Sequence, residues 1–140
     1  MLKFFKKLLQ ASERRKHGRQ AVHATVKFRI LDGKNPAISS RIIDGKVIDM
    51  SPGGLCIGTN TVHIDGLHIF HHATSMYKNK LEIEVELHPD QPPLRTRGEA
   101  SWYDRSAEGS ETVYKFGVNW GSLSKSDRQV LESFLAQGGR

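Results

Sequence analysis

The sequence predicts a mainly all-β fold, a small antiparallel barrel of about six or seven strands with one helix near the C-terminus. Several stretches alternate apolar with polar residues, which is typical of strands that bury one face. Glycine, proline and aspartate separate these stretches at short intervals. At 140 residues, the chain is expected to form one domain and to bury a core without disulfides or metal.

The first strands follow a basic N-terminal region. Residues 21–30 alternate strictly, which predicts a strand that buries Val22, Ala24, Val26, Phe28 and Ile30. Residues 38–49 predict a second strand, in which Asp44-Gly45 suggests a β-bulge or a local twist. The turn sequence Ser-Pro-Gly-Gly at 51–54 leads into a short third strand at 55–57.

The second half of the chain continues the strand pattern. Apolar residues alternate with glutamates at 80–88, and further strands are predicted at 94–103 and 112–120. A polar turn at 104–111 joins the last two strands. We expect the aromatic residues of these two strands to lie in the core: Trp102, Tyr103, Tyr114, Phe116 and Trp120.

A helix is predicted to end the chain. Ser124 with Asp127 three residues later resembles a capping box. The apolar face of this helix consists of Val130, Leu131, Phe134 and Leu135. By contrast, residues 59–80 have no clear period and hold four histidines, His63, His68, His71 and His72.

Residues 1–12 form a separate basic segment. At 100° per residue, the apolar side chains of residues 1–10 fall within an arc of about 160°, which predicts a short amphipathic helix. Its apolar face is expected to pack on the domain or on a partner subunit, and peripheral contact with a membrane surface is the alternative.

The charge of the chain is concentrated in this region. Residues 1–20 carry seven lysines and arginines against one glutamate, which equals the net charge of +6 for the whole chain. The rest of the sequence is therefore neutral. Residues 11–20 have no apolar period, and we interpret them as a mobile cationic arm. Such a short arm suits a compact anion or an anionic membrane surface better than long duplex DNA.

The arm and the turn at 49–54 have the chemistry of a nucleotide site. Arginine presents a planar fork of donors that can bind a phosphate or the edge of guanine. Asp49 can accept from the amino and imino groups of guanine, and Ser51 adds a hydroxyl. We expect Gly54 to adopt a positive φ and to let the backbone approach a ligand. Without a ligand, the same residues are equally typical of a side-chain-capped turn between two strands.

Taken in order, these motifs resemble the PilZ domain family. The sequence reads Arg-Arg-x-x-x-Arg at 14–19 and, after a strand, Asp-x-Ser-x-x-Gly at 49–54. Two later segments are also similar, Gly-Glu-Ala-Ser-Trp-Tyr at 98–103 and Tyr-Lys-Phe-Gly-Val-Asn-Trp at 114–120. The resemblance covers residues 13–137, which we therefore expect to be a PilZ domain.

The resemblance implies a six-stranded antiparallel β-barrel of the PilZ split-barrel type. It also implies the ligand, bis-(3′,5′)-cyclic dimeric guanosine monophosphate (cyclic di-GMP), a bacterial second messenger. By position, the resemblance implies that Arg14, Arg15 and Arg19 contact the phosphates and guanines of the ligand. It implies that Asp49 accepts hydrogen bonds from a guanine. It further implies that Ser51 forms a hydrogen bond to the ligand and that Gly54 shapes the turn.

Two further expectations follow from the family. An arginine directly before the Arg-x-x-x-Arg pair goes with two intercalated ligand molecules, and Arg14 supplies it here. Ligand binding is expected to change the conformation of the chain and to regulate a downstream protein partner in motility, biofilm or polysaccharide output. A protein that keeps this fold as a ligand-independent adaptor is the alternative.

Other function classes fit the sequence less well. No pattern for a catalytic nucleophile, a phosphate-binding loop or a zinc protease is present, so we expect a binding protein and not an enzyme. The four histidines match no standard metal site, and we expect neither a metal nor a cofactor besides the ligand. A small barrel for single-stranded nucleic acid would carry basic and aromatic strands, whereas these strands balance acid with base.

The compartment follows from the cysteine and from hydropathy. The lone Cys56 lies in an apolar context, as a small core residue would, and a single cysteine fits a reducing compartment. Lysines interrupt the apolar residues at the N-terminus, so neither a signal peptide nor a membrane span is expected. We therefore expect a bacterial cytoplasmic protein, with peripheral contact at the inner membrane as the alternative.

Overall fold

The strands form one curled antiparallel sheet in the computed structural model, which describes residues 20–22, 24–71, 77–108, 111–121 and 123–138. Of the residues 106–108 and 111–112, only the backbone is described. The sheet contains eight strands in the order β8-β7-β2-β3-β4-β10-β9, and β1 pairs with β3 beside this path. The bounds are β1 Gln20–Ala21, β2 Thr25–Leu31, β3 Ile43–Ser51, β4 Gly54–Thr59, β7 Lys80–Glu86, β8 Leu94–Gly98, β9 Ala100–Glu108 and β10 Glu111–Asn119.

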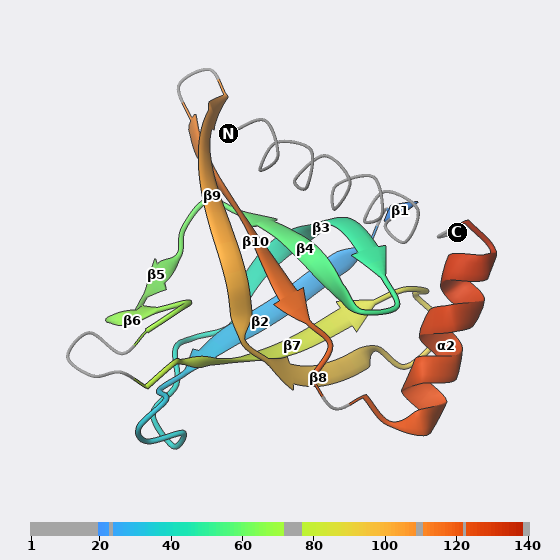
Figure 1. Cartoon of the computed structure of the whole chain (residues 1–140), viewed down its shortest axis with the longest axis horizontal. Helices are drawn as coiled ribbons and strands as arrows, with labels where there is room; N and C mark the ends of the chain where they lie inside the picture. The colour runs from blue at the N-terminus through green and yellow to red at the C-terminus, as the bar shows by residue number, and fades with distance from the viewer. Residues whose placement is uncertain (1–19, 23, 72–76, 109–110, 122, 139–140) are drawn as a thin grey trace, which may run out of the picture.

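The connection between β8 and β9 shows why the sheet curls. These two strands lie at opposite ends of the order, yet only Glu99 separates them in the chain. A flat sheet cannot meet both conditions, so the sheet bends back on itself into the barrel-like shape seen in Figure 1. This confirms the predicted all-β, barrel-type fold, with more strands than the expected six.

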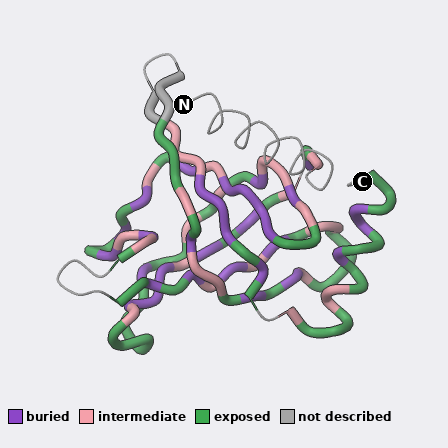
Figure 2. Tube along the Cα trace, viewed as in Figure 1, coloured by how far each residue is buried: buried purple, intermediate pink, exposed green. Residues whose placement is uncertain are grey.

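Alternating side chains fill the space inside the curled sheet. Figure 2 shows buried residues along the central strands, and the inward positions of β2 and β7 are Val26, Phe28, Ile30, Leu81, Ile83 and Val85. Phe28 meets Phe116 of β10 edge to face, with ring centroids 5.4 Å apart. Such a pair adds about 0.5–1.5 kcal/mol beyond the burial of its area. Cys56 is buried in β4, as predicted for a small core residue.

The C-terminal helix α2, Lys125–Ala136, closes one end of this barrel. Its first turn is capped as predicted, because Ser124 Oγ accepts a hydrogen bond of 3.0 Å from the backbone N–H of Asp127. Leu131, Phe134 and Leu135 are buried. Figure 1 shows the helix beside β1 and the β3–β4 turn. Among the described residues, no helix has the length and apolar character needed to cross a membrane.

A second, two-stranded sheet accounts for part of the region without a clear period. β5, His63–Ile64, pairs with β6, Leu67–His68, across the turn Asp65-Gly66. Both turn residues have positive φ, 53° and 80°. This is the chemistry of a two-residue hairpin turn, so the Asp-Gly pair was the signal for this element in the sequence.

Several predicted boundaries were wrong. The strand expected at 21–30 is interrupted, because β1 ends at Ala21 and β2 begins at Thr25. The strand expected from residue 38 begins at Ile43, and Ile38 and Ile42 are exposed. The type of a side chain does not show where a strand starts to pair with its neighbour. Among the described residues between β2 and β3, the only β-bridge is the one that joins Ser39 to Leu31.

The last two strands also differ from the prediction. The stretch 94–103 contains two strands that pair with different neighbours, β8 with β7 and β9 with β10. β9 continues to Glu108, so the turn expected at 104–111 is shorter. Tyr103 is 48% exposed instead of buried, because it lies against His68 and Phe70 outside the core.

Other predictions concern residues that the structure does not describe. The helix expected at 1–10, the arm with Arg14, Arg15 and Arg19, and His72 lie outside the described residues.

Candidate functional site

The candidate site is built on the turn between β3 and β4. A β-bulge just before the turn decides which way its side chains face. Lys46 and Val47 pair with Gly58 and Ile57, but Asp49 then pairs with Cys56, so Ile48 is the extra residue. The bulge predicted at Asp44-Gly45 was wrong, because both residues pair regularly with β2.

The extra residue changes the face on which the motif lies. Side chains alternate along a strand, so a regular strand with Val47 inward would also turn Asp49 inward. With Ile48 inserted, Val47 and Met50 are both buried, while Asp49 and Ser51 are only partly buried. The bulge therefore presents the two polar residues of the motif on the same side of β3.

The chain that follows the arginine arm lies directly beside Asp49. In the antiparallel pairing of β1 with β3, Ala21 is the partner of Asp49 and Gln20 is the partner of Met50. Paired residues have Cα atoms about 5 Å apart. Arg19 precedes Gln20 in the sequence and is itself outside the described residues. The structure therefore brings the attachment point of the arm to Asp49, although it does not describe the arm.

Ser51 closes the turn with its own hydroxyl. Its Oγ accepts hydrogen bonds from the backbone N–H groups of Gly53 and Gly54, each at 3.2 Å. The side-chain-capped turn, one of the two interpretations of the sequence, is therefore present. The same hydroxyl donates to the carbonyl oxygen of Gly54 in a long hydrogen bond, with 3.5 Å between the two oxygens. A ligand acceptor can replace that weak contact without breaking the turn.

Gly54 is needed for a different reason from the expected one. The glycines with positive φ in the described chain are Gly66 and Gly138, so the prediction for Gly54 was wrong. Instead, a Cβ atom on Gly54 would lie 2.4 Å from the carbonyl oxygen of Val118 in β10. Real Cβ atoms do not come this close to backbone oxygen, so the absence of a side chain lets β4 approach β10.

Residues far along the chain also hold the turn, and sequence analysis missed them. Trp120 directly follows β10 and is buried. Its Nε1 donates to the carbonyl oxygen of Ser51 at 2.8 Å, and its backbone N–H donates to the carbonyl oxygen of Gly53 at 3.1 Å. Gln20 donates from Nε2 to the carbonyl oxygen of Leu135 at 3.0 Å, which ties β1 to the end of α2. No local pattern identifies such contacts.

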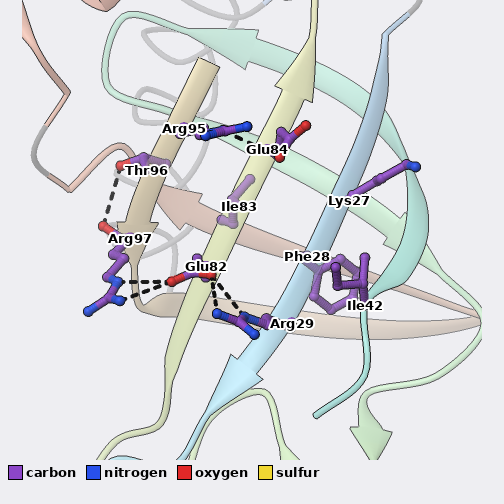
Figure 3. Close-up of a pocket in the computed structure, with 10 residues that line it drawn as sticks. All are labelled: Lys27, Phe28, Arg29, Ile42, Glu82, Ile83, Glu84, Arg95, Thr96 and Arg97. Carbon is purple, nitrogen blue, oxygen red and sulfur yellow. Dashed lines mark hydrogen bonds and ion pairs between the residues drawn. The ribbon is translucent and has the colours of Figure 1, made fainter. Parts of the chain in front are cut away.

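A separate hollow lies on the outer face of β2, β7 and β8 and has a volume of about 630 Å³ (Figure 3). Glu82 accepts from Arg29 Nε at 2.8 Å and from Arg97 Nη2 at 3.0 Å. Burial opposes the charge of Glu82, but these two hydrogen bonds outweigh it and hold the pKa of the carboxyl below its ordinary value. Because its arginines are already paired with carboxylates, we interpret this face as a cross-strand ion-pair ladder.

The described histidines of the β5–β6 region belong to a cluster of aromatic rings with Phe70 and Tyr103. His63 and His68 are cross-strand partners with ring centroids 6.4 Å apart. Over the described ranges, no three His, Cys, Asp or Glu side chains come together in a way that would hold a metal ion. His68 Nδ1 accepts from the backbone N–H of Phe70 at 3.1 Å, which requires an unprotonated nitrogen there.

Residues 13–137 match the family described as PilZ domain. No curated protein sequence matches the chain.

Several solved structures are similar in fold. The PilZ domain of YcgR from Escherichia coli, solved with c-di-GMP, has a TM-score of 0.56 and 12% identity, and the match covers 86% of this chain and 87% of that one. MrkH of K. pneumonia in its apo state has a TM-score of 0.60 and 13% identity, over 86% and 49% of the two chains. The inhibitor of motility MotI/DgrA of Bacillus subtilis has a TM-score of 0.56 and 13% identity, over 86% and 48%. The chain thus spans about half the length of MrkH and of MotI/DgrA.

Proposed function

Because the chain belongs to the PilZ domain family, we propose that it is a non-enzymatic receptor for cyclic di-GMP that binds its ligand between the arginine arm and the β3–β4 turn. The observation that carries this proposal is the pairing of Ala21 with Asp49. This pairing brings Gln20 and Ala21, which directly follow the first motif in the sequence, beside the second motif about thirty residues later. The complex of the similar YcgR domain with c-di-GMP supports the choice of ligand.

Each residue has a role that its chemistry allows. Arg14, Arg15 and Arg19 bind the phosphates and the edges or faces of the guanines. Asp49 accepts from the donors of one guanine. The hydroxyl of Ser51 donates a hydrogen bond to the ligand, while its oxygen still accepts from the two amides that close the turn. Gly54 acts only through the shape of the turn.

The charge distribution suits this division of labour. Seven of the cationic side chains lie in residues 1–20, while the barrel beyond them is neutral. Ordering a mobile arm costs conformational entropy, and charge-assisted hydrogen bonds to two phosphates offset that cost. Ligand binding therefore orders the arm against β3, and a protein partner reads the change.

The test is isothermal titration of the wild type and of Arg15→Ala and Asp49→Ala with cyclic di-GMP, with cyclic di-AMP and GTP as competing nucleotides. Each substitution removes a charge-assisted hydrogen bond, so each is expected to weaken binding by about tenfold or more. Arg95→Ala is the matched control, because it removes an exposed arginine on the outer face of β8.

The same titrations test the stoichiometry. We propose that two intercalated ligand molecules bind per chain and that Arg14→Ala reduces this number to one. A wild type that binds no cyclic di-GMP, or that binds all three nucleotides equally, would contradict the proposed function. Equal weakening in Arg95→Ala and Arg15→Ala would show that only net charge matters.

A ligand-independent adaptor is the second candidate. It is favoured by one observation, that Ser51 and Gly54 both have complete structural roles in the turn without any ligand. In that case Asp49→Ala and Arg15→Ala would leave the function in the cell unchanged. A barrel for single-stranded nucleic acid is disfavoured, because lysine and arginine on β2 and β8 face glutamates on β7.

A further inference from the structure

The β3–β4 turn is held through its carbonyl oxygens by the C-terminal part of the chain. The carbonyls of Ser51 and Gly53 accept from Trp120, as described above. The carbonyl between them, that of Pro52, accepts a hydrogen bond of 3.1 Å from Nη1 of Arg128. Three consecutive carbonyl oxygens thus receive hydrogen bonds from residues 120 and 128.

These bonds matter because carbonyl oxygens repel an anionic ligand. A carbonyl that is bound to a donor is less able to rotate toward a phosphate. The same bonds keep the turn in the form in which the N–H groups of Gly53 and Gly54 meet Ser51 Oγ. The conformation in which Asp49 and Ser51 are presented therefore depends on donors outside the motif.

Arg128 differs from Trp120 in one respect that makes its role separable. Trp120 is part of the core, so its removal would also destabilise the whole domain. Arg128 lies in the first turn of α2 and is only partly buried, so it is not part of the buried core. Within the described part of the chain, Arg128 makes one hydrogen bond to the turn, and its acceptor is the carbonyl oxygen of Pro52. Its planar, always charged guanidinium also suits a site next to an anion.

We propose that Arg128 is a positioning residue for the ligand site, which holds the β3–β4 turn through the carbonyl oxygen of Pro52. Its effect on cyclic di-GMP affinity rests on the proposed function. Its effect on the turn does not, because this hydrogen bond joins two residues of the chain itself.

The experiment compares three variants in the full chain. Arg128→Met removes the donor and keeps the volume, and Arg128→Lys keeps a charged donor. Lys125→Met removes the same charge from an exposed position of the same helix and is the matched control. We expect Arg128→Met to raise the Kd for cyclic di-GMP about tenfold, Arg128→Lys to recover part of this loss, and Lys125→Met to change it by less than about twofold.

A second readout separates this inference from the proposed function. Hydrogen exchange of the Gly53 and Gly54 amides is measured without ligand, and it is expected to be faster in Arg128→Met and unchanged in Lys125→Met. If the wild type binds no cyclic di-GMP, the proposed function has failed, and faster exchange still supports the role of Arg128. Unchanged exchange in Arg128→Met would overturn the inference whatever the affinity. So would an equal rise in Kd for Arg128→Met and Lys125→Met.

Discussion

His68 is the residue whose surroundings affect its chemistry most clearly. Burial lowers the pKa of its imidazole below the ordinary value of 6.5, and the positive charges of His63 and His71 lower it further. The hydrogen bond from the N–H of Phe70 to Nδ1 is also lost when that nitrogen is protonated. The folded chain therefore favours neutral His68.

A pH dependence of stability follows from this residue. The unfolded chain takes up a proton at His68 near pH 6.5, whereas the folded chain resists it until lower pH. Stability should therefore be complete above about pH 6.5 and should fall as the pH drops below it. The pKa of the Glu82 carboxyl lies below its ordinary value of 4.5, so its protonation lowers stability only at a more acidic pH.

The measurement is the melting temperature at about pH 7.5 and about pH 5.5. His68→Asn keeps an acceptor near the position of Nδ1 and should show a smaller loss on acidification than the wild type. His88→Asn, outside the cluster and beside Phe134, is the matched control and should retain the wild-type loss. The same loss in His68→Asn as in the wild type would contradict the assignment.

At the scale of elements, the close approach of β4 to β10 makes a sharper prediction. Gly54→Ala places a Cβ 2.4 Å from the carbonyl oxygen of Val118, so one backbone must move. We expect the free energy of unfolding to fall by about 1–3 kcal/mol, the usual cost of overpacking. Gly53→Ala is the control, because its Cβ would lie 3.8 Å from Ser51 Oγ, an ordinary contact. Urea denaturation of both variants measures the difference, and equal changes would refute this role for Gly54.

The elements also show what the sequence could and could not predict. The strand at 80–88 was found, as β7, because its glutamates and apolar residues alternate without exception. The bulge at Ile48 was missed, because a bulge is defined by the count of residues against the partner strand. Ile38 and Ile42 misled the analysis, since apolar residues at an exposed approach to a strand look like part of it.

The candidate site was predictable only in its local parts. Asp49, Ser51 and Gly54 lie within six residues, and their pattern indicated a turn that can bind a ligand. The donors that hold this turn are 69 and 76 residues away in sequence from their acceptors. Pairings of such long range depend on how the whole sheet curls, and no single-sequence period encodes them.

At the scale of the whole molecule, the proposed receptor is a neutral barrel with a cationic arm. We expect cyclic di-GMP to shift the backbone amide signals of residues 1–20, because ordering the arm changes the surroundings of the adjoining segment. Signals of β5 and β6, which belong to the separate small sheet, are the internal control and should change little. Identical spectra for residues 1–20 with and without ligand would argue against this coupling.

The hydrogen bond between Gln20 and Leu135 has a practical consequence. It places the start of the described chain beside the end of the last helix, so a dye attached at position 137 would report on events at the arm. The chain has one cysteine, Cys56, and it is 3% exposed. Gln137→Cys would therefore be labelled selectively without a cysteine-free background. We therefore expect a single substitution to convert the proposed receptor into a fluorescent sensor of its ligand.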